Sequence, residues 1–263
     1  MASFLFDEKR QDNQSMKIVS YNLRNRGNTR ADNHWVQLLR QFEPDIVCAQ
    51  ESLHPGQYFP EDEFSTFKSC VHALVPQHRK WGSAIFSRKH VLEPVELPEL
   101  NGWVVAAKAH GVIVGGRTQA VFVVSIHAPS PGPYLPVVSA VLDQVARVWD
   151  GTPLVICGDF NVTTALRHPS EAPMTNSLGE RQLLTRLRRE FGVVNAWQTM
   201  SPNENLPQTL RWTRNPATAY HCDGIFISHH FLPHLVSASI ESAGEWATMS
   251  DHNPIVVSLE EGE

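Results

Sequence analysis

The sequence has few cysteines, and none of them is spaced as a zinc or redox pair. The four cysteines are Cys48, Cys70, Cys157 and Cys222, and the chain contains no CxxC segment. Three of them lie in or beside apolar, strand-like segments, where a free thiol behaves as a small hydrophobic group. This distribution argues against a disulfide framework, a cysteine-based metal site and thiol redox chemistry.

Long apolar runs and an excess of positive charge are also lacking. No segment approaches the roughly 18 consecutive apolar residues of a spanning helix, and charged residues at 7–10 occupy the place where a signal peptide needs its apolar centre. With 22 Lys and Arg against 27 Asp and Glu, the net charge is -5. The chain therefore has no overall basic surface for non-specific binding of nucleic acid or anionic membranes. We expect a cytoplasmic protein without stable membrane insertion, which holds any phosphate-bearing substrate locally.

Apolar anchors, by contrast, are abundant. Hydrophobic residues make up 42% of the 263 residues, including 12 Phe, 7 Trp and 4 Tyr, which excludes a disordered chain. The length suits one globular domain. We expect a polar N-terminal leader over residues 1–15 and a single domain over residues 16–263, and nothing in the sequence demands more than a monomer.

Short β-branched runs predict the strands, and a polar residue borders each run. The runs cover residues 18–21, 46–49, 121–126, 154–157, 225–227 and 255–259. Continuous apolar runs of this length are typical of strands buried on both faces. Helical spacing of apolar residues predicts helices from Asp32 to Phe42, from Pro133 to Trp149 and around Leu183 to Phe191. We therefore predict an α/β fold in which two packed sheets with substantial antiparallel pairing carry outer helices.

The polar residues at the strand ends are rich in hard oxygen donors. They are Asn22, Glu51, Asp159, Asn161 and Asp251, together with the imidazoles His127 and His252. Such oxygens suit Mg²⁺ or Mn²⁺ and are poor ligands for zinc. A divalent cation in this setting neutralises charge on a phosphoryl oxygen and orients an attacking water, so the set favours hydrolysis of a phosphate ester.

Two interpretations stay open for the individual residues. On an extended segment, Asp159 and Asn161 face the same side and share one water, with Asp159 as general base; alternatively, both satisfy local backbone groups in a turn. His252 is oriented either by the distant carboxylate of Asp223 or by local strand capping. His127 is an acid, a phosphate ligand or a satisfied core residue.

Six short motifs, in this order, resemble a known family. They are SYNLR at 20–24, QES at 50–52, SIHAP at 125–129, GDFN at 158–161, HCDGIFIS at 221–228 and SDHNPIVV at 250–257. Together they resemble the endonuclease/exonuclease/phosphatase superfamily, which has the deoxyribonuclease-I-like fold. The resemblance implies a four-layer α/β sandwich, with two mixed, mostly antiparallel sheets face to face and helices outside, and Mg²⁺-dependent hydrolysis of phosphoester bonds.

The resemblance also implies a role for each matched position. Glu51 corresponds to the metal-binding glutamate of the family, Asn22 to the asparagine beside it and Asp251 to the second carboxylate on the metal side. The water is activated or oriented at the position of Asp159, with Asn161 as its partner. The remaining catalytic positions are His127, which contacts the phosphate or the leaving group, and the pair formed by His252 and Asp223.

Three positions bear on the substrate. Arg24 stands where apurinic-site endonucleases of the family often carry an acidic residue, which suggests a phosphate contact. His221 replaces the usual arginine before the fifth strand and is either a phosphate contact or simply tolerated. Trp212 resembles an aromatic position that some members place against a base or sugar, although packing explains it equally well.

The function we expect is that of a Mg²⁺-dependent nuclease acting on DNA or RNA. The alternative on the same scaffold is a phosphatase or phospholipase-C-like phosphodiesterase acting on a phosphoinositide, sphingomyelin or a small phosphoester, because substrate choice depends on the loops. A third hypothesis is a catalytically inactive binding module.

Overall fold

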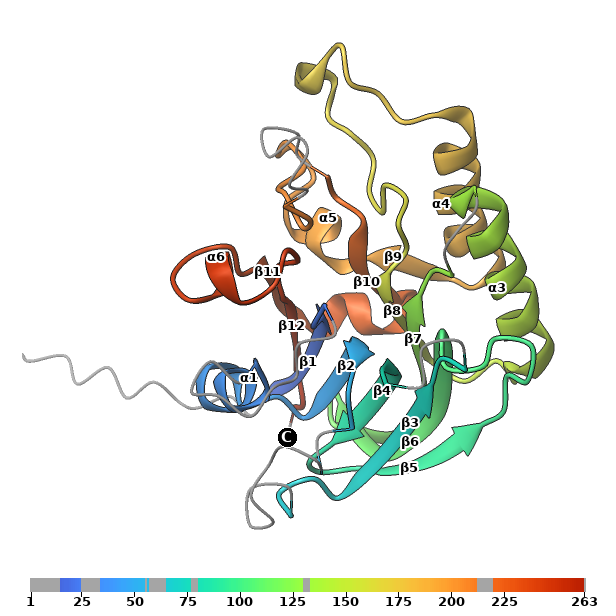
Figure 1. Ribbon diagram of the computed structural model, residues 1–263, viewed down its shortest axis with the longest axis vertical. Coiled ribbons are helices and arrows are strands. Elements are labelled where there is room, and N and C mark those ends of the chain that lie inside the picture. The colour runs from blue at the N-terminus through green and yellow to red at the C-terminus, as the bar shows by residue number, and fades with distance from the viewer. Residues whose placement is uncertain are drawn as a thin grey trace, which may run out of the picture.

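Two six-stranded sheets packed face to face form the centre of the protein (Figure 1). The computed structural model describes residues 15–24, 34–54, 56, 65–76, 80–129, 133–211 and 220–262. The predicted leader lies outside these residues except for its last position, Ser15, where the first strand begins.

Both sheets are mixed and mostly antiparallel. The first has the order β11 (Leu235–Ile240), β12 (Ile255–Glu260), β1 (Ser15–Asn22), β2 (Ile46–Ser52), β4 (Gly82–Ser87) and β3 (Ser69–Leu74). The second has the order β5 (Val91–Val95), β6 (Val104–Val114), β7 (Arg117–His127), β8 (Leu154–Asp159), β10 (Asp223–Ser228) and β9 (Val193–Asn195). One strand pair in each sheet is parallel, β1 with β2 and β7 with β8, and the other pairs are antiparallel.

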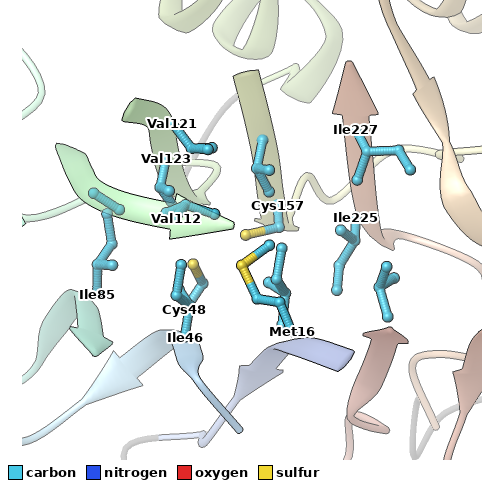
Figure 2. Packing of buried hydrophobic residues seen from close by; sticks show 14 of the residues in the cluster. Met16, Ile46, Cys48, Ile85, Val112, Val121, Val123, Cys157, Ile225 and Ile227 are labelled. Atoms are coloured by element: carbon cyan, nitrogen blue, oxygen red, sulfur yellow. The ribbon is translucent and has the colours of Figure 1, made fainter. Parts of the chain in front are cut away.

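The main core fills the space between the two sheets. Figure 2 shows side chains of the first sheet, such as Met16 and Cys48, facing Val123 and Cys157 of the second, and all four are fully buried. This packing explains the continuous apolar runs, because the inner strands that carry them also bury their other face under helices. Cys48, Cys157 and Cys222 are buried free thiols and Cys70 is partly buried, so the prediction that cysteines serve as small hydrophobic residues is confirmed.

Helices cover the outer face of each sheet and complete the predicted four layers. Against the first sheet pack α1 (His34–Phe42) and α6 (Trp246–Met249), whose rings Phe42 and Trp246 stack with centroids 5.4 Å apart. Against the second pack α3 (Tyr134–Val148) and α4 (Leu178–Glu190). The short helices are η2 (Pro169–Glu171), α5 (Ala196–Met200) and η3 (His229–His234). Over the described ranges, none of the helices is both long and apolar enough to cross a membrane.

The strand register brings the polar strand ends to one edge of the sandwich. In the first sheet Asn22 lies beside Gln50, the residue before Glu51. In the second sheet Asp159 lies between His127 on one side and Asp223 on the other. The convergence predicted from the sequence is therefore a consequence of register across five strands, β1, β2, β7, β8 and β10.

Candidate active site

Asp159, at the end of β8, lies at the centre of the polar cluster. Its Oδ2 accepts a hydrogen bond from Asn22 Nδ2 at 3.0 Å across the two sheets. The Nε2 atoms of His252 and His127 lie 3.7 Å and 3.9 Å from the same oxygen. Because Asp159 is only 2% exposed, burial raises the pKa of its carboxyl group. This one carboxylate thus gathers side chains from both sheets and from the segment before β12.

His252 forms a buried pair with Asp223. Its Nδ1 lies 2.9 Å and 3.0 Å from the two carboxylate oxygens, so the expected orientation of His252 by a distant carboxylate is present. Burial alone would lower the pKa of His252, but the negative charges of Asp223 and Asp159 outweigh it and raise the pKa to about 10. The ring is therefore an imidazolium at neutral pH, with its Nε2 directed at Asp159.

Carboxylates gather on the side of the site predicted to hold the metal. Glu51 Oε1 lies 3.7 Å from His127 Nε2. Burial raises the pKa of Glu51 to about 7; the charge of His252 opposes this, and the charges of Asp159 and Asp251 add to it. Asp251 Oδ2 is paired with Arg24 Nε at 3.1 Å.

These groups fit a hard divalent cation. A cation would stabilise the ionised form of the half-buried Glu51, whose pKa is raised first by burial and then by the charges of Asp159 and Asp251. Carboxylate and amide oxygens are also the donors that Mg²⁺ and Mn²⁺ prefer. Glu51, Asp251 and the Oδ1 of Asn22 would hold it; that Oδ1 also accepts the backbone N–H of Arg24 at 2.9 Å. A second set of residues also has possible metal-ligand atoms close together. One such atom from each residue of the set lies within 4.8 Å of the others, the residues being Asp159, Cys222, Asp223 and His252. The hydrogen bonds between His252 and Asp223 account for part of that closeness.

The backbone of the site adopts conformations that most residues avoid. Arg24, Glu51 and Asn161 all have positive φ, at 53°, 47° and 52°. Gly158, at φ 137°, brings the chain so close to β7 that a Cβ atom there would lie 1.9 Å from the carbonyl oxygen of Ile126. Only glycine fits this approach, which places Asp159 at the edge of the sheet.

Of the two interpretations left open for Asp159 and Asn161, the structure shows the turn. Asp159 and Asn161 do not lie on one extended segment, because β8 ends at Asp159 and Asn161 is left-handed. Asp159 Oδ1 instead accepts the backbone N–H of Asn161 at 2.9 Å, which is the local turn that was the alternative interpretation. The turn leaves Asp159 Oδ2 directed at Asn22 and the histidines, so the carboxylate serves both the turn and the cluster.

One predicted substrate contact, His221, lies away from the cluster. His221 is 2% exposed, with Nδ1 2.8 Å from the carbonyl oxygen of Pro207 and its ring 5.5 Å from that of Trp197. Burial lowers the pKa of His221 to about 4, so its ring is neutral, and these contacts lend no support to a phosphate contact. Trp212 lies outside the described residues.

Two residues that no sequence motif marks, Thr209 and Arg211, hold the site together. The buried hydroxyl oxygen of Thr209 accepts the backbone N–H groups of Cys222 at 2.9 Å and Asp223 at 3.1 Å. The guanidinium of Arg211 donates to carbonyl oxygens around the His252 segment and to the side-chain oxygen of Asn253. Both belong to QTLRW, upstream of β10, where no periodicity or motif marks them as site residues.

A buried hydrogen bond also joins the two sheets beneath the site. Gln50 Nε2 donates to Ser125 Oγ at 3.0 Å and to the carbonyl oxygen of Cys48 at 3.1 Å. Gln50 precedes Glu51 on β2, and Ser125 lies two residues before His127 on β7. This contact therefore helps to fix the position of β2 relative to β7, and with it the position of Glu51 relative to His127.

Comparison with known proteins identifies the family. The pattern of the Endonuclease/Exonuclease/phosphatase family matches residues 19–252. The chain belongs to this family, which together with the assembled site defines it as a phosphoesterase. No curated protein matches the sequence.

Solved structures share the fold over nearly the whole chain. An AP endonuclease from Archaeoglobus fulgidus is 20% identical, with a TM-score of 0.68, over 93% of this chain and 99% of that one. The 3′-5′ exonuclease NExo from Neisseria meningitidis is 23% identical, with a TM-score of 0.66, over 93% and 100%. The 3′ phosphatase NExo from Neisseria, bound to a product DNA hairpin, is 22% identical, with a TM-score of 0.65, over 93% and 99%. At these identities the likeness establishes the fold.

Proposed function

We propose that the protein is a metal-dependent hydrolase of phosphodiester bonds, and specifically a nuclease acting on DNA or RNA. The observation that carries the proposal is the convergence on Asp159 Oδ2 of Asn22 from β1, His127 from β7 and the imidazolium of His252. A carboxylate between a carboxamide and a cation suits the positioning of a water for attack on phosphorus.

Each side chain then has a distinct task. Asp159 orients the attacking water and accepts its proton, a role that the raised pKa of its carboxyl group favours. His252, held by Asp223, places positive charge where negative charge develops on the phosphate oxygens. His127 contacts the phosphate or the leaving group, Asn161 assists at the water, and Arg24 contributes a second cation near Asp251.

We assign the metal site to Asn22, Glu51 and Asp251 and propose Mg²⁺, with Mn²⁺ as a substitute. When bound, the cation would neutralise charge on a non-bridging phosphate oxygen and lower the pKa of a coordinated water. The surroundings of Glu51 support this assignment, because burial and then the nearby charges of Asp159 and Asp251 raise the pKa of its carboxyl group, and a bound cation would favour its ionised form.

Nucleic acid is the substrate we favour, because the structural neighbours include a DNA-bound enzyme and an apurinic-site endonuclease. The same neighbours include a 3′ phosphatase, so removal of a terminal phosphate from DNA is the second candidate activity. A cytoplasmic, monomeric enzyme, as expected from the sequence, completes the proposal.

A substrate panel tests the proposal. Single-stranded DNA, duplex DNA with and without an abasic site, RNA, a 3′-phosphorylated oligonucleotide, sphingomyelin and an inositol phosphate are each incubated with Mg²⁺, Mn²⁺ or EDTA. The control is Asp159→Asn, which should fold normally and lose at least about 100-fold in turnover, the usual scale for loss of a general base. Metal-dependent cleavage of nucleic acid by the wild type alone supports the proposal. Activity confined to the lipid or the inositol phosphate contradicts it.

A further inference from the structure

Two tryptophans, Trp81 and Trp103, pack against His127 of the candidate site. The ring centroid of Trp103 lies 5.1 Å from that of His127, and the centroid of Trp81 lies 5.5 Å from it. The two indoles contact each other edge to face, with centroids 5.5 Å apart and planes at 86°. Neither tryptophan belongs to a motif of the resemblance, and they precede different strands, β4 and β6. The three rings together are called the aromatic cluster below.

The backbone fixes this cluster in place. The carbonyl oxygen of Trp103 accepts the backbone N–H of His127 at 2.8 Å and the hydroxyl of Ser83 at 2.8 Å. The preceding Gly102, at φ 76°, packs so tightly that a Cβ atom there would lie 2.2 Å from the backbone of Leu74. The position of Trp103 relative to His127 is thus set by main-chain contacts, which a change of the indole side chain leaves in place.

The cluster adjoins the charged part of the site and keeps exposed surface. His127 Nε2 lies 3.7 Å from Glu51 Oε1 and 3.9 Å from Asp159 Oδ2. The two indoles therefore contact a ring that itself lies next to both carboxylates. Both tryptophans are half-buried, whereas Trp35 and Trp246 are almost fully buried. A large apolar ring that remains partly exposed beside a charged site is suited to contact a ligand as well as the core.

We propose that Trp81 and Trp103 form a stacking subsite for the nucleobase of a nucleotide that flanks the scissile phosphate. The proposal rests on the nucleolytic function proposed above and names the part of the substrate that the site recognises. A base is a flat π system joined to its phosphate through one sugar, and stacking on an aromatic side chain stabilises it without regard to sequence. This contact also compensates for the lack of net positive charge, since the protein carries 22 Lys and Arg against 27 Asp and Glu and cannot rely on phosphate neutralisation alone.

The test compares protein variants on substrates with and without the base. Each substrate is a single-stranded oligonucleotide with one cleavable phosphodiester, the other linkages being phosphorothioates. The flanking nucleotides are intact or, one side at a time, replaced by a tetrahydrofuran abasic analogue. The variants are Trp103→Leu, Trp81→Leu and Trp103→Phe. The matched control is Trp149→Leu, since Trp149 is also half-buried but packs on Phe191 at the end of α3.

If the indoles stack on a base, the loss of apparent affinity in a tryptophan variant should depend on whether the substrate carries that base. Trp103→Leu should raise KM about 5- to 150-fold on the intact oligonucleotide, the scale of one lost base–aromatic stack. It should have little effect on the oligonucleotide in which the abasic analogue replaces the nucleotide that stacks. Trp103→Phe should recover most of the affinity, and Trp149→Leu should show no difference between substrates. Should Trp103→Leu fail to fold, Trp81→Leu provides the same comparison.

Other outcomes overturn the inference and separate it from the proposed function. Equal losses on intact and abasic substrates, in a wild type that cleaves both, leave the nuclease in place and refute the stacking subsite. A wild type that cleaves no oligonucleotide refutes both. If that wild type instead hydrolyses p-nitrophenylphosphorylcholine and Trp103→Leu abolishes this activity, the rings bind a quaternary ammonium group by cation–π contact.

Discussion

The hydroxyl group of Thr209 offers a sharp test of how the site is held together. It accepts two backbone N–H groups, those of Cys222 at 2.9 Å and Asp223 at 3.1 Å, and all three residues are buried. Thr209→Val keeps the shape of the side chain but leaves both donors without this acceptor. An unsatisfied buried donor costs about 1–3 kcal/mol, and the gain from one buried methyl group offsets part of the sum. We therefore expect the free energy of unfolding to fall by about 2–4 kcal/mol.

Thermal and urea unfolding measure this change. At about 2–4 °C per kcal/mol for a domain of this size, Thr209→Val should lower Tm by about 4–16 °C and shift the urea midpoint without changing its slope. Turnover should also fall, by about 10- to 100-fold, because Asp223 no longer holds the ring of His252 in place. Thr209→Ser, which keeps the hydroxyl group, should lose much less of both. If Thr209→Val unfolds at the same temperature as Thr209→Ser, the two hydrogen bonds do not carry the stability assigned to them.

Three further predictions follow from single residues. Glu51→Gln should raise the Mg²⁺ concentration for half-maximal activity by at least about 10-fold, and an unchanged metal titration would contradict its role as ligand. Because the pKa of His221 falls from 6.5 in the unfolded chain to about 4 on folding, the unfolded state takes up the proton first as the pH drops. The free energy of unfolding should therefore decrease by about 3 kcal/mol between about pH 6.5 and pH 4. In His221→Phe the urea midpoint should depend less steeply on pH over this range, by a slope that corresponds to about one bound proton. Gly158→Ala should lose about 1–3 kcal/mol or more, since its Cβ would meet the backbone of Ile126; a Tm equal to that of the wild type would refute that clash.

Local patterns predicted the secondary structure well because they report burial. The apolar run before Asp159 forms β8, and that before His127 forms β7, each with every residue of the run buried. The predicted helix from Pro133 to Trp149 is α3, Tyr134–Val148, with one apolar face on the sheet. The predicted helix from Asp32 to Phe42 is α1 over its described part, and Asp32 lies outside the described residues.

Conformation at single residues was harder to predict, because a short polar segment has several ways of satisfying its backbone. Asn161 illustrates this, since its left-handed φ depends on the hydrogen bond to Asp159 and on the close approach of Gly158 to β7. His221 is a second case: the sequence offered a phosphate contact, whereas the structure buries its ring against Trp197.

The sequence by itself determined the strands that carry the site, the polar groups that border them and the metal chemistry that those groups suit, because apolar runs and donor type are properties of short segments. Tertiary structure alone decided which of these groups meet. Asn22 and Asp159 are 137 residues apart yet share a hydrogen bond, since strand register and the packing of two sheets bring their strand ends to one edge. The support from Thr209 and Arg211, and the tryptophans beside His127, likewise arise from contacts between distant segments that no local pattern encodes.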